Sequence, residues 1–137
     1  MTISQYISDL LKKYKKIEID TNHVRDGSDQ YGLFKAPSRN ITNYTDGSYA
    51  ITEYYEFLAR QNAGSIEERK EADEWLEDLA YWADDLGVIY ELPPLDNGRY
   101  VTGFAITGSP YSMESDSRES LYQILLSITY VREREGV

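Results

Sequence analysis

The sequence predicts an α+β fold, with a mostly antiparallel sheet of about five to six strands and two helices packed on one face. Residues 3–14 and 65–86 carry apolar side chains at the three- and four-residue spacing of amphipathic helices. Around them lie runs rich in Tyr, Ile, Val and Thr, broken by turn pairs such as Asp46-Gly47. The length of 137 residues is most simply that of one domain, residues 1–137.

The first predicted element is an amphipathic helix. Its apolar positions run from Ile3 to Tyr14 and follow Thr2, a residue type that caps helices. Four lysines between positions 12 and 16 lie where the helix dipole favours positive charge. Composition and periodicity therefore agree on a helix that buries one side.

Two short strands are expected next, at Ile17–Asp20 and Gly32–Lys35. The polar stretch between them is predicted to be a loop or a hairpin connection. Pro37 is predicted to end the second strand, because proline has no N–H to donate to a sheet.

A long hairpin is predicted around Asp46-Gly47, between strand-like runs at 39–44 and 48–60. An Asp-Gly pair in this setting favours a type I′ turn, in which both central residues have positive φ. One face of the longer arm carries the predicted core residues Tyr49, Ile51, Tyr55, Phe57 and Ala59. The other face carries Ala50, Thr52, Tyr54, Leu58 and Arg60, so the strand is apolar on both sides.

The second helix is predicted from Ser65, which forms a capping box with Glu68, to a stop at Gly87. Its apolar side carries Ala72, Trp75, Leu76, Leu79, Ala83 and Leu86. A second side carries a row of like charges, Glu67, Glu71, Glu74 and Asp78. This row is either an ordinary solvated face or a negative stripe directed at a partner or a channel.

Two further strands are predicted at 100–109 and 120–135, with a polar, acidic loop at 110–118 between them. The last strand has an unbroken apolar face from Tyr122 to Tyr130 and a mixed face that includes Leu125 and Val131. Two helices on one side leave the other side of the sheet uncovered, and we expect a second chain to cover it.

Composition argues against several classes of function. The chain has no Cys, and His23 is its single histidine, so a disulfide framework, a thiolate nucleophile and a multi-His metal site are all excluded within one chain. No phosphate-binding glycine motif or GxSxG elbow is present. The formal net charge of −10 opposes binding to nucleic acid or anionic lipid. We therefore expect a cytosolic protein that is not an enzyme and has no cofactor, metal or membrane association.

Four features together resemble a known family. They are Tyr-x-Asp-Gly-Ser at 44–48, the aromatic strand that ends in Phe57 and Arg60, the acidic helix with Trp75, and Tyr-x-Ile-x-Leu-x-Ile-x-Tyr at 122–130. This order resembles the small tail-terminator, or tail-completion, proteins of long-tailed phages and prophages of Gram-positive bacteria, some of which are labelled minor capsid proteins. Residues 21–31 and 110–118 carry no part of the resemblance.

The resemblance implies a structural virion protein that forms a homo-oligomeric ring, usually a hexamer, at the head–tail junction. Such a ring caps the head-proximal end of the tail tube, ends tail polymerisation, and meets the tail tube protein and a head-completion or connector protein. It assembles in the host cytoplasm. DNA passes through the lumen without specific binding, and an acidic wall repels it over a Debye length of ~8 Å.

The predicted subunit interface consists of sheet and turn residues: Asp46, Gly47, Tyr54, Leu58, Arg60, Leu125 and Val131. The 110–118 loop is a further candidate for the contact with the tail tube or the head. The alternative function is a small acidic immunity or inhibitor protein that masks a basic partner. Charge and tyrosine content fit both functions, whereas apolar strand faces longer than one docking patch favour the ring.

Overall fold

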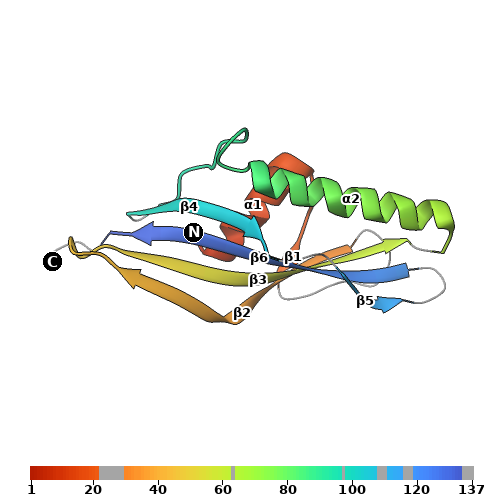
Figure 1. The fold of residues 1–137 in the computed structure, drawn as a ribbon, viewed down its shortest axis with the longest axis horizontal. Helices are drawn as coiled ribbons and strands as arrows, with labels where there is room; N and C mark the ends of the chain where they lie inside the picture. The colour runs from red at the N-terminus through yellow and green to blue at the C-terminus, as the bar shows by residue number, and fades with distance from the viewer. Residues whose placement is uncertain (22–29, 63, 97, 108–110, 116–118, 134–137) are drawn as a thin grey trace.

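A computed structural model describes residues 1–21, 30–62, 64–96, 98–107, 111–115 and 119–133. The elements, in chain order, are α1 (Ile3–Lys15), β1 (Asp20–Thr21), β2 (Gln30–Asn43), β3 (Tyr49–Asn62), α2 (Ile66–Asp85), β4 (Arg99–Ile106), β5 (Tyr111–Ser115) and β6 (Glu119–Arg132). The class is therefore α+β, as predicted, with two helices and a sheet that is antiparallel except at β1 (Figure 1).

The strand order is β1-β2-β3-β6-β4, and β5 pairs with β6 beside that path. Four long antiparallel strands, β2, β3, β6 and β4, form the body of the sheet, fewer than the five to six expected. The other two strands are short additions: β1 has two residues and runs parallel to β2, and β5 has five. The prediction that 110–118 is a loop was wrong for Tyr111–Ser115, because this segment pairs with β6.

Strand β2 is continuous where two separate strands were predicted. It runs through Pro37, and the pairing register with β3 shifts between Lys35 and Arg39. β1 pairs only with Gly32 and Leu33, so the described part of β2 beyond them is a sheet edge. Proline is tolerated at an edge or a bulge, where its missing N–H breaks no ladder bond. Pro37 therefore bends the strand and does not end it.

The turn between β2 and β3 confirms the predicted hairpin but not its type. The Gly47 N–H donates to the Tyr44 carbonyl (3.2 Å), and the Tyr44 N–H donates to the Ser48 carbonyl (2.9 Å). Gly47 has φ 91°, whereas Asp46 does not have positive φ. This is a three-residue loop with a glycine bulge, in which only the glycine needs the left-handed region.

Both helices begin at the predicted caps. The Thr2 hydroxyl accepts the Gln5 N–H (3.1 Å), and the Ser65 hydroxyl accepts the Glu68 N–H (3.1 Å). Such caps satisfy donors in the first turn that have no partner within the helix. Past the end of α2, Gly87 has φ 84°, which fits the predicted stop.

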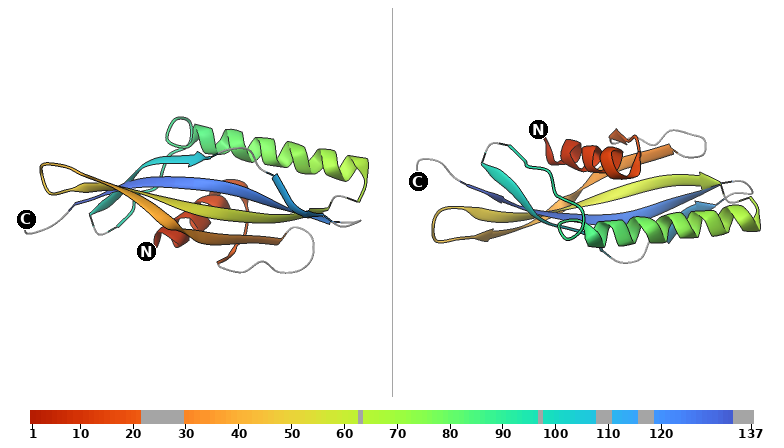
Figure 2. Two further views of the ribbon diagram at one scale, coloured as in Figure 1. Left: turned by 60° about the horizontal axis from the view of Figure 1, so that its bottom comes forward. Right: turned by 90° about the horizontal axis from the view of Figure 1, so that it is seen from above.

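The two helices lie side by side on one face of the sheet, and the β2–β3 hairpin extends beyond both of them (Figures 1 and 2). Trp75 of α2 packs near Phe57, with ring centroids 6.4 Å apart, and Trp82 meets Phe104 at 6.1 Å. The core is completed by buried side chains from α1, β3 and β6: Ile3, Tyr6, Ile7, Leu10, Leu11, Tyr55, Ala59, Ile124, Leu126 and Ile128. Within the described ranges, no helix is long and apolar enough to span a membrane.

Candidate subunit interface

The sheet face turned away from the helices contains most of the predicted interface residues. We call it the open sheet face. Residues that pair across antiparallel strands share a face, so the register assigns its members. It comprises Gly32, Phe34, Asn40 and Thr42 of β2; Ala50, Thr52, Tyr54, Glu56, Leu58 and Arg60 of β3; Leu121, Gln123, Leu125, Ser127, Thr129 and Val131 of β6; and Tyr100 and Ala105 of β4.

Burial alternates strictly along β3. The residues on the helix-covered face are buried, and those on the open sheet face from Ala50 to Arg60 are only partly buried. Leu125 is 39% exposed, and Tyr100 at the β4 edge is also exposed. Tyr54, Leu58 and Leu125 therefore supply apolar surface that neither helix covers.

The structure places the other predicted residues differently. Val131 lies on the same face but is only 6% exposed, so it has little area left to bury against a second chain. Arg60 is partly buried, and its Nε has no hydrogen-bond partner among the described residues. Of the five sheet residues predicted, Tyr54, Leu58 and Leu125 are the ones with apolar surface available.

Polar groups on the open sheet face pair with one another. The Asn40 side-chain amide donates to the Tyr54 hydroxyl (2.9 Å), and the hydroxyls of Thr52 and Thr129 share a hydrogen bond (2.9 Å). Paired groups lose less on leaving water than unpaired ones. The face is therefore suited to contact with another protein surface.

Asp46 and Gly47 lie at the tip of the hairpin, apart from Tyr54, Leu58 and Leu125. The Asp46 carboxylate accepts the Ser48 N–H (2.9 Å) and its hydroxyl (2.5 Å). These bonds stabilise the charged form and lower the pKa of Asp46. The two residues set the shape of an exposed turn, while Ile41 and Tyr44 are the exposed apolar residues of the same arm.

A buried carboxylate was missed by sequence analysis. Glu53 is 3% exposed on the helix-covered face of β3, between the predicted core residues Ile51 and Tyr55. Its oxygens accept the hydroxyls of Tyr55 (3.1 Å) and Tyr130 (3.2 Å), and Lys35 Nζ lies 3.2 Å away. Burial, together with the nearby Glu53 charge, raises the pKa of Tyr130 to about 12. The one available signal was a Glu at an alternating core position.

A cavity of about 490 Å³ adjoins Glu53. Its lining combines the start of α1 with basic and hydroxyl side chains: Thr2, Ile3, Ser4, Lys35, Glu53, Tyr55, Arg99 and Tyr130. The hydroxyls and Lys35 already hold the carboxylate, so these contacts join β2, β3 and β6 at the base of the hairpin arm. Among residues with described positions, no three His, Asp or Glu side chains gather as metal ligands.

The acidic row of α2 lies on the surface. Glu67, Glu71, Glu74 and Asp78 are all exposed. Tyr81 is exposed among further acids, and its pKa is raised, chiefly because its hydroxyl donates to Glu77 (2.9 Å). The outer side of α2 is thus strongly negative from Glu71 onward, whereas Arg69 and Lys70 are exposed in its first turns.

No protein-family model and no curated protein matches this sequence. Function therefore has to be argued from the open sheet face, the hairpin and the charge distribution.

Proposed function

We propose that this protein is a structural subunit of a long-tailed phage or prophage, which forms a ring at the head-proximal end of the tail tube. The ring, a hexamer by the family resemblance, ends tail polymerisation and offers a joining surface to the head-completion protein. No reaction, cofactor or specific DNA contact is assigned to it.

One observation supports this proposal above others: the open sheet face has apolar surface that the described part of the chain leaves uncovered. Tyr54, Leu58 and Leu125 lie on that face, opposite both helices. A stable interface buries roughly 800 Å² on each partner, and aromatic and aliphatic side chains at its centre contribute most of the affinity. A ring of more than two subunits requires that this face meet a different surface of the next copy, in a head-to-tail contact that closes by rotation.

Charge supports a passive role toward DNA. From residue 71 to residue 85 the chain has seven acidic residues and no basic one. Four carboxylates of α2 are exposed: Glu67, Glu71, Glu74 and Asp78. If this surface lines the lumen, DNA is repelled from it at physiological salt and slides past.

Substitutions on the open sheet face test the proposal. Tyr54→Glu and Leu58→Asp place a charge where a neighbour would cover it, at a cost of several kcal/mol to the contact. We expect both variants to fold, and to leave tail tubes overgrown or unjoined to heads when they are produced in the phage. Tube lengths in negative-stain images and infectious titre are the measurements.

Ile66→Asp is the matched control. Ile66 is an exposed apolar residue at the start of α2, far from the open sheet face, and an acid there suits the helix dipole. It should leave tube length and titre unchanged. Normal particles from both Tyr54→Glu and Leu58→Asp would contradict the proposed interface.

A second candidate is an acidic immunity or inhibitor protein that masks a basic partner, and the acidic outer side of α2 favours it. In that case, replacing Glu74 and Asp78 by Lys should abolish binding to the basic partner, whereas Leu58→Asp should not. Genes for tail tube and head-completion proteins on either side favour the ring; an adjacent toxin gene favours inhibition.

A further inference from the structure

The turn that follows α2 presents two aliphatic side chains to water. Val88 is 81% exposed and Ile89 is 73% exposed, the largest fractions among the described large apolar residues. Scattered single apolar residues on a surface need no explanation, but two adjacent, almost fully exposed β-branched residues form a projecting apolar contact. We call Val88 and Ile89 the apolar turn.

The backbone holds the apolar turn in one conformation. The N–H groups of Val88, Ile89 and Tyr90 all point to the Asp85 carbonyl, at 3.0, 2.9 and 3.2 Å. The Gly87 N–H donates to the Tyr90 carbonyl (2.7 Å), and Gly87 supplies the positive φ. A turn fixed in this way loses little conformational entropy on binding, which favours association.

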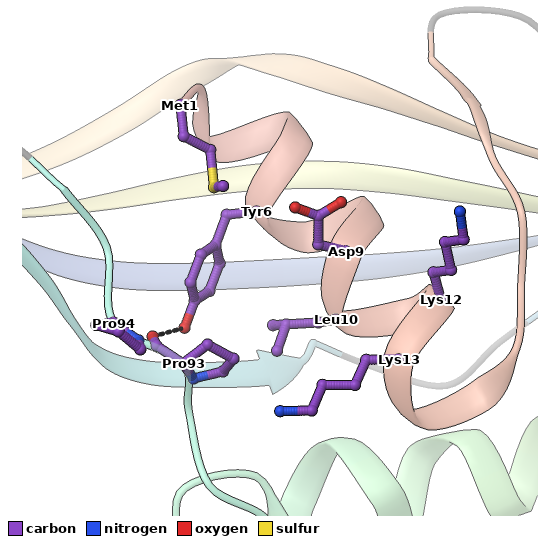
Figure 3. A pocket seen from close by; sticks show the side chains of 8 residues that line it. All are labelled: Met1, Tyr6, Asp9, Leu10, Lys12, Lys13, Pro93 and Pro94. Carbon is purple, nitrogen blue, oxygen red and sulfur yellow. Dashed lines mark hydrogen bonds between the residues drawn. The ribbon is translucent and has the colours of Figure 1, made fainter.

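A groove lies between α1 and the segment that leads to β4 (Figure 3). It measures about 420 Å³ and is lined by Met1, Tyr6, Asp9, Leu10, Lys12, Lys13, Pro93 and Pro94. The Tyr6 hydroxyl donates to the Pro93 carbonyl (2.7 Å) and so fixes one wall to the other. A volume of this size accommodates a Val and an Ile side chain together.

The groove lies near the apolar turn, because Tyr14 follows the groove residue Lys13 and contacts the segment just after the turn. The Tyr14 ring lies 5.4 Å from the Tyr90 ring, and the Tyr14 hydroxyl donates to the Glu91 carbonyl (2.6 Å). Lys13 Nζ lies 5.1 Å from the centre of the Tyr14 ring. The turn and the groove are therefore neighbours on the helix side of the molecule.

The charges around the two features are complementary. Asp84 and Glu91 flank the apolar turn, and both are exposed. Lys12 and Lys13 line the groove, and Lys13 extends toward its Pro93 side in Figure 3. Asp9 is the one acidic side chain of the lining, and it already accepts the Gln5 side-chain amide (2.8 Å). The molecule has a net charge of −10, so basic side chains are scarce on it. The lysines of α1 are therefore one of the few surfaces that could bind the acidic residues beside the apolar turn.

We propose that two copies of this chain pair through their helix layers, each placing its apolar turn in the groove of the other. Because turn and groove adjoin, a single two-fold axis satisfies both contacts at once, as isologous dimers require. This surface is separate from the open sheet face. The proposal does not rest on the ring.

Two truncations and a charge exchange test the pairing. The double variant Val88→Ser, Ile89→Ser removes the apolar side chains from both contacts of the two-fold dimer. It should raise the dimer dissociation constant at least about 100-fold. Lys12→Glu with Lys13→Glu, and separately Asp84→Lys with Glu91→Lys, should each prevent self-pairing by repulsion. Mixed together, the two charge variants should pair with each other, because both of their contacts then join opposite charges.

Sedimentation velocity and native mass spectrometry provide the readout, and circular dichroism checks that every variant is folded. A wild-type chain that stays monomeric at about 1 mM would overturn the proposal. So would charge variants that fail to pair when mixed, or truncations that leave the dimer intact. Leu58→Asp separates this proposal from the ring: it should abolish capping of tail tubes and leave the two-fold pair unchanged.

Discussion

The two faces of β3 differ in burial far more than in composition. On the helix side, Phe57 and Ala59 are fully buried; one residue away, on the open sheet face, Leu58 is only partly buried. Tyrosines occur on both sides, with Tyr55 inside and Tyr54 outside. Along β3, burial therefore follows the helix cover on one face and not the apolar character of the side chain.

This difference separates residues that hold the chain folded from residues available for assembly. Removing apolar area from water is favourable by roughly 25 cal/mol per Å², and between two chains this gain is partly offset by the freedom that the partners lose. On the helix side that stabilisation is already realised in the single chain. On the open sheet face it becomes available on association.

The largest difference in stability between the two faces of β3 is expected from a pair of truncations. Phe57→Ala should lower the free energy of unfolding by about 3–5 kcal/mol, because it leaves a cavity beneath Trp75. Leu58→Ala should cost about 1 kcal/mol or less in the monomer. Urea unfolding monitored by circular dichroism measures both. Equal losses would mean that the open sheet face is covered within the single chain.

A smaller effect is expected from the buried carboxylate. Glu53→Ala leaves the hydroxyls of Tyr55 and Tyr130 without their acceptor and should cost about 1–3 kcal/mol. Glu56→Ala, one step along on the open sheet face, is the control and should change stability by about 0.5 kcal/mol or less. If the two losses match in urea unfolding, the Glu53 cluster adds nothing specific.

Alkaline pH should also distinguish the two faces of β3 and β6, because a buried tyrosine on the helix-covered face titrates at a raised pKa. The pKa of Tyr130 rises from 10.0 to about 12 in the folded chain. Because the pKa is higher in the folded chain than in the unfolded chain, the contribution of Tyr130 to the free energy of unfolding is complete below pH 10. It is lost as the pH rises toward 12. Above pH 10 this residue should lower the unfolding free energy by about 1.4 kcal/mol per pH unit. Urea midpoints between pH 9 and 12 measure the slope.

Tyr130→Phe should flatten that slope, and Tyr54→Phe on the open sheet face should leave it as it is. Tyr6 and Tyr55, whose pKa values are also raised by burial, maintain a residual slope in both variants. Identical slopes for wild type and Tyr130→Phe would contradict the assignment.

The smallest effect is expected at the hairpin tip, where neither face is covered. Gly47→Ala forces a Cβ into a backbone with φ 91° and should cost about 1 kcal/mol. Thr45→Ala, in the same turn but without positive φ, should change stability by about 0.5 kcal/mol or less. Thermal unfolding of the two variants makes the comparison.

Periodicity predicted the helices and the two faces of β3 because these depend on local spacing. Thr2 and Ser65 cap the helices as expected, and the alternation from Tyr49 to Ala59 matches the observed burial. Local chemistry was also enough to locate the turn at Asp46-Gly47, but not to choose between two turn geometries that both favour this pair.

Features that depend on distant contacts were not predicted. Pro37 does not end its strand because it lies on a sheet edge, a fact that sequence alone does not give. Glu53 is buried because Tyr130, 77 positions away, donates to it. The groove joins α1 to Pro93, which lies 87 positions from Tyr6. Contacts between residues so far apart produce no pattern in the local sequence.

The register shift at Lys35 and Arg39 has a consequence for how copies can associate. An exposed border of a sheet invites another strand to extend the ladder, which leads to fibres. Here Pro37 offers no donor to an incoming strand, and the local bend misaligns the remaining groups. This border of β2 therefore resists continuous growth by added strands.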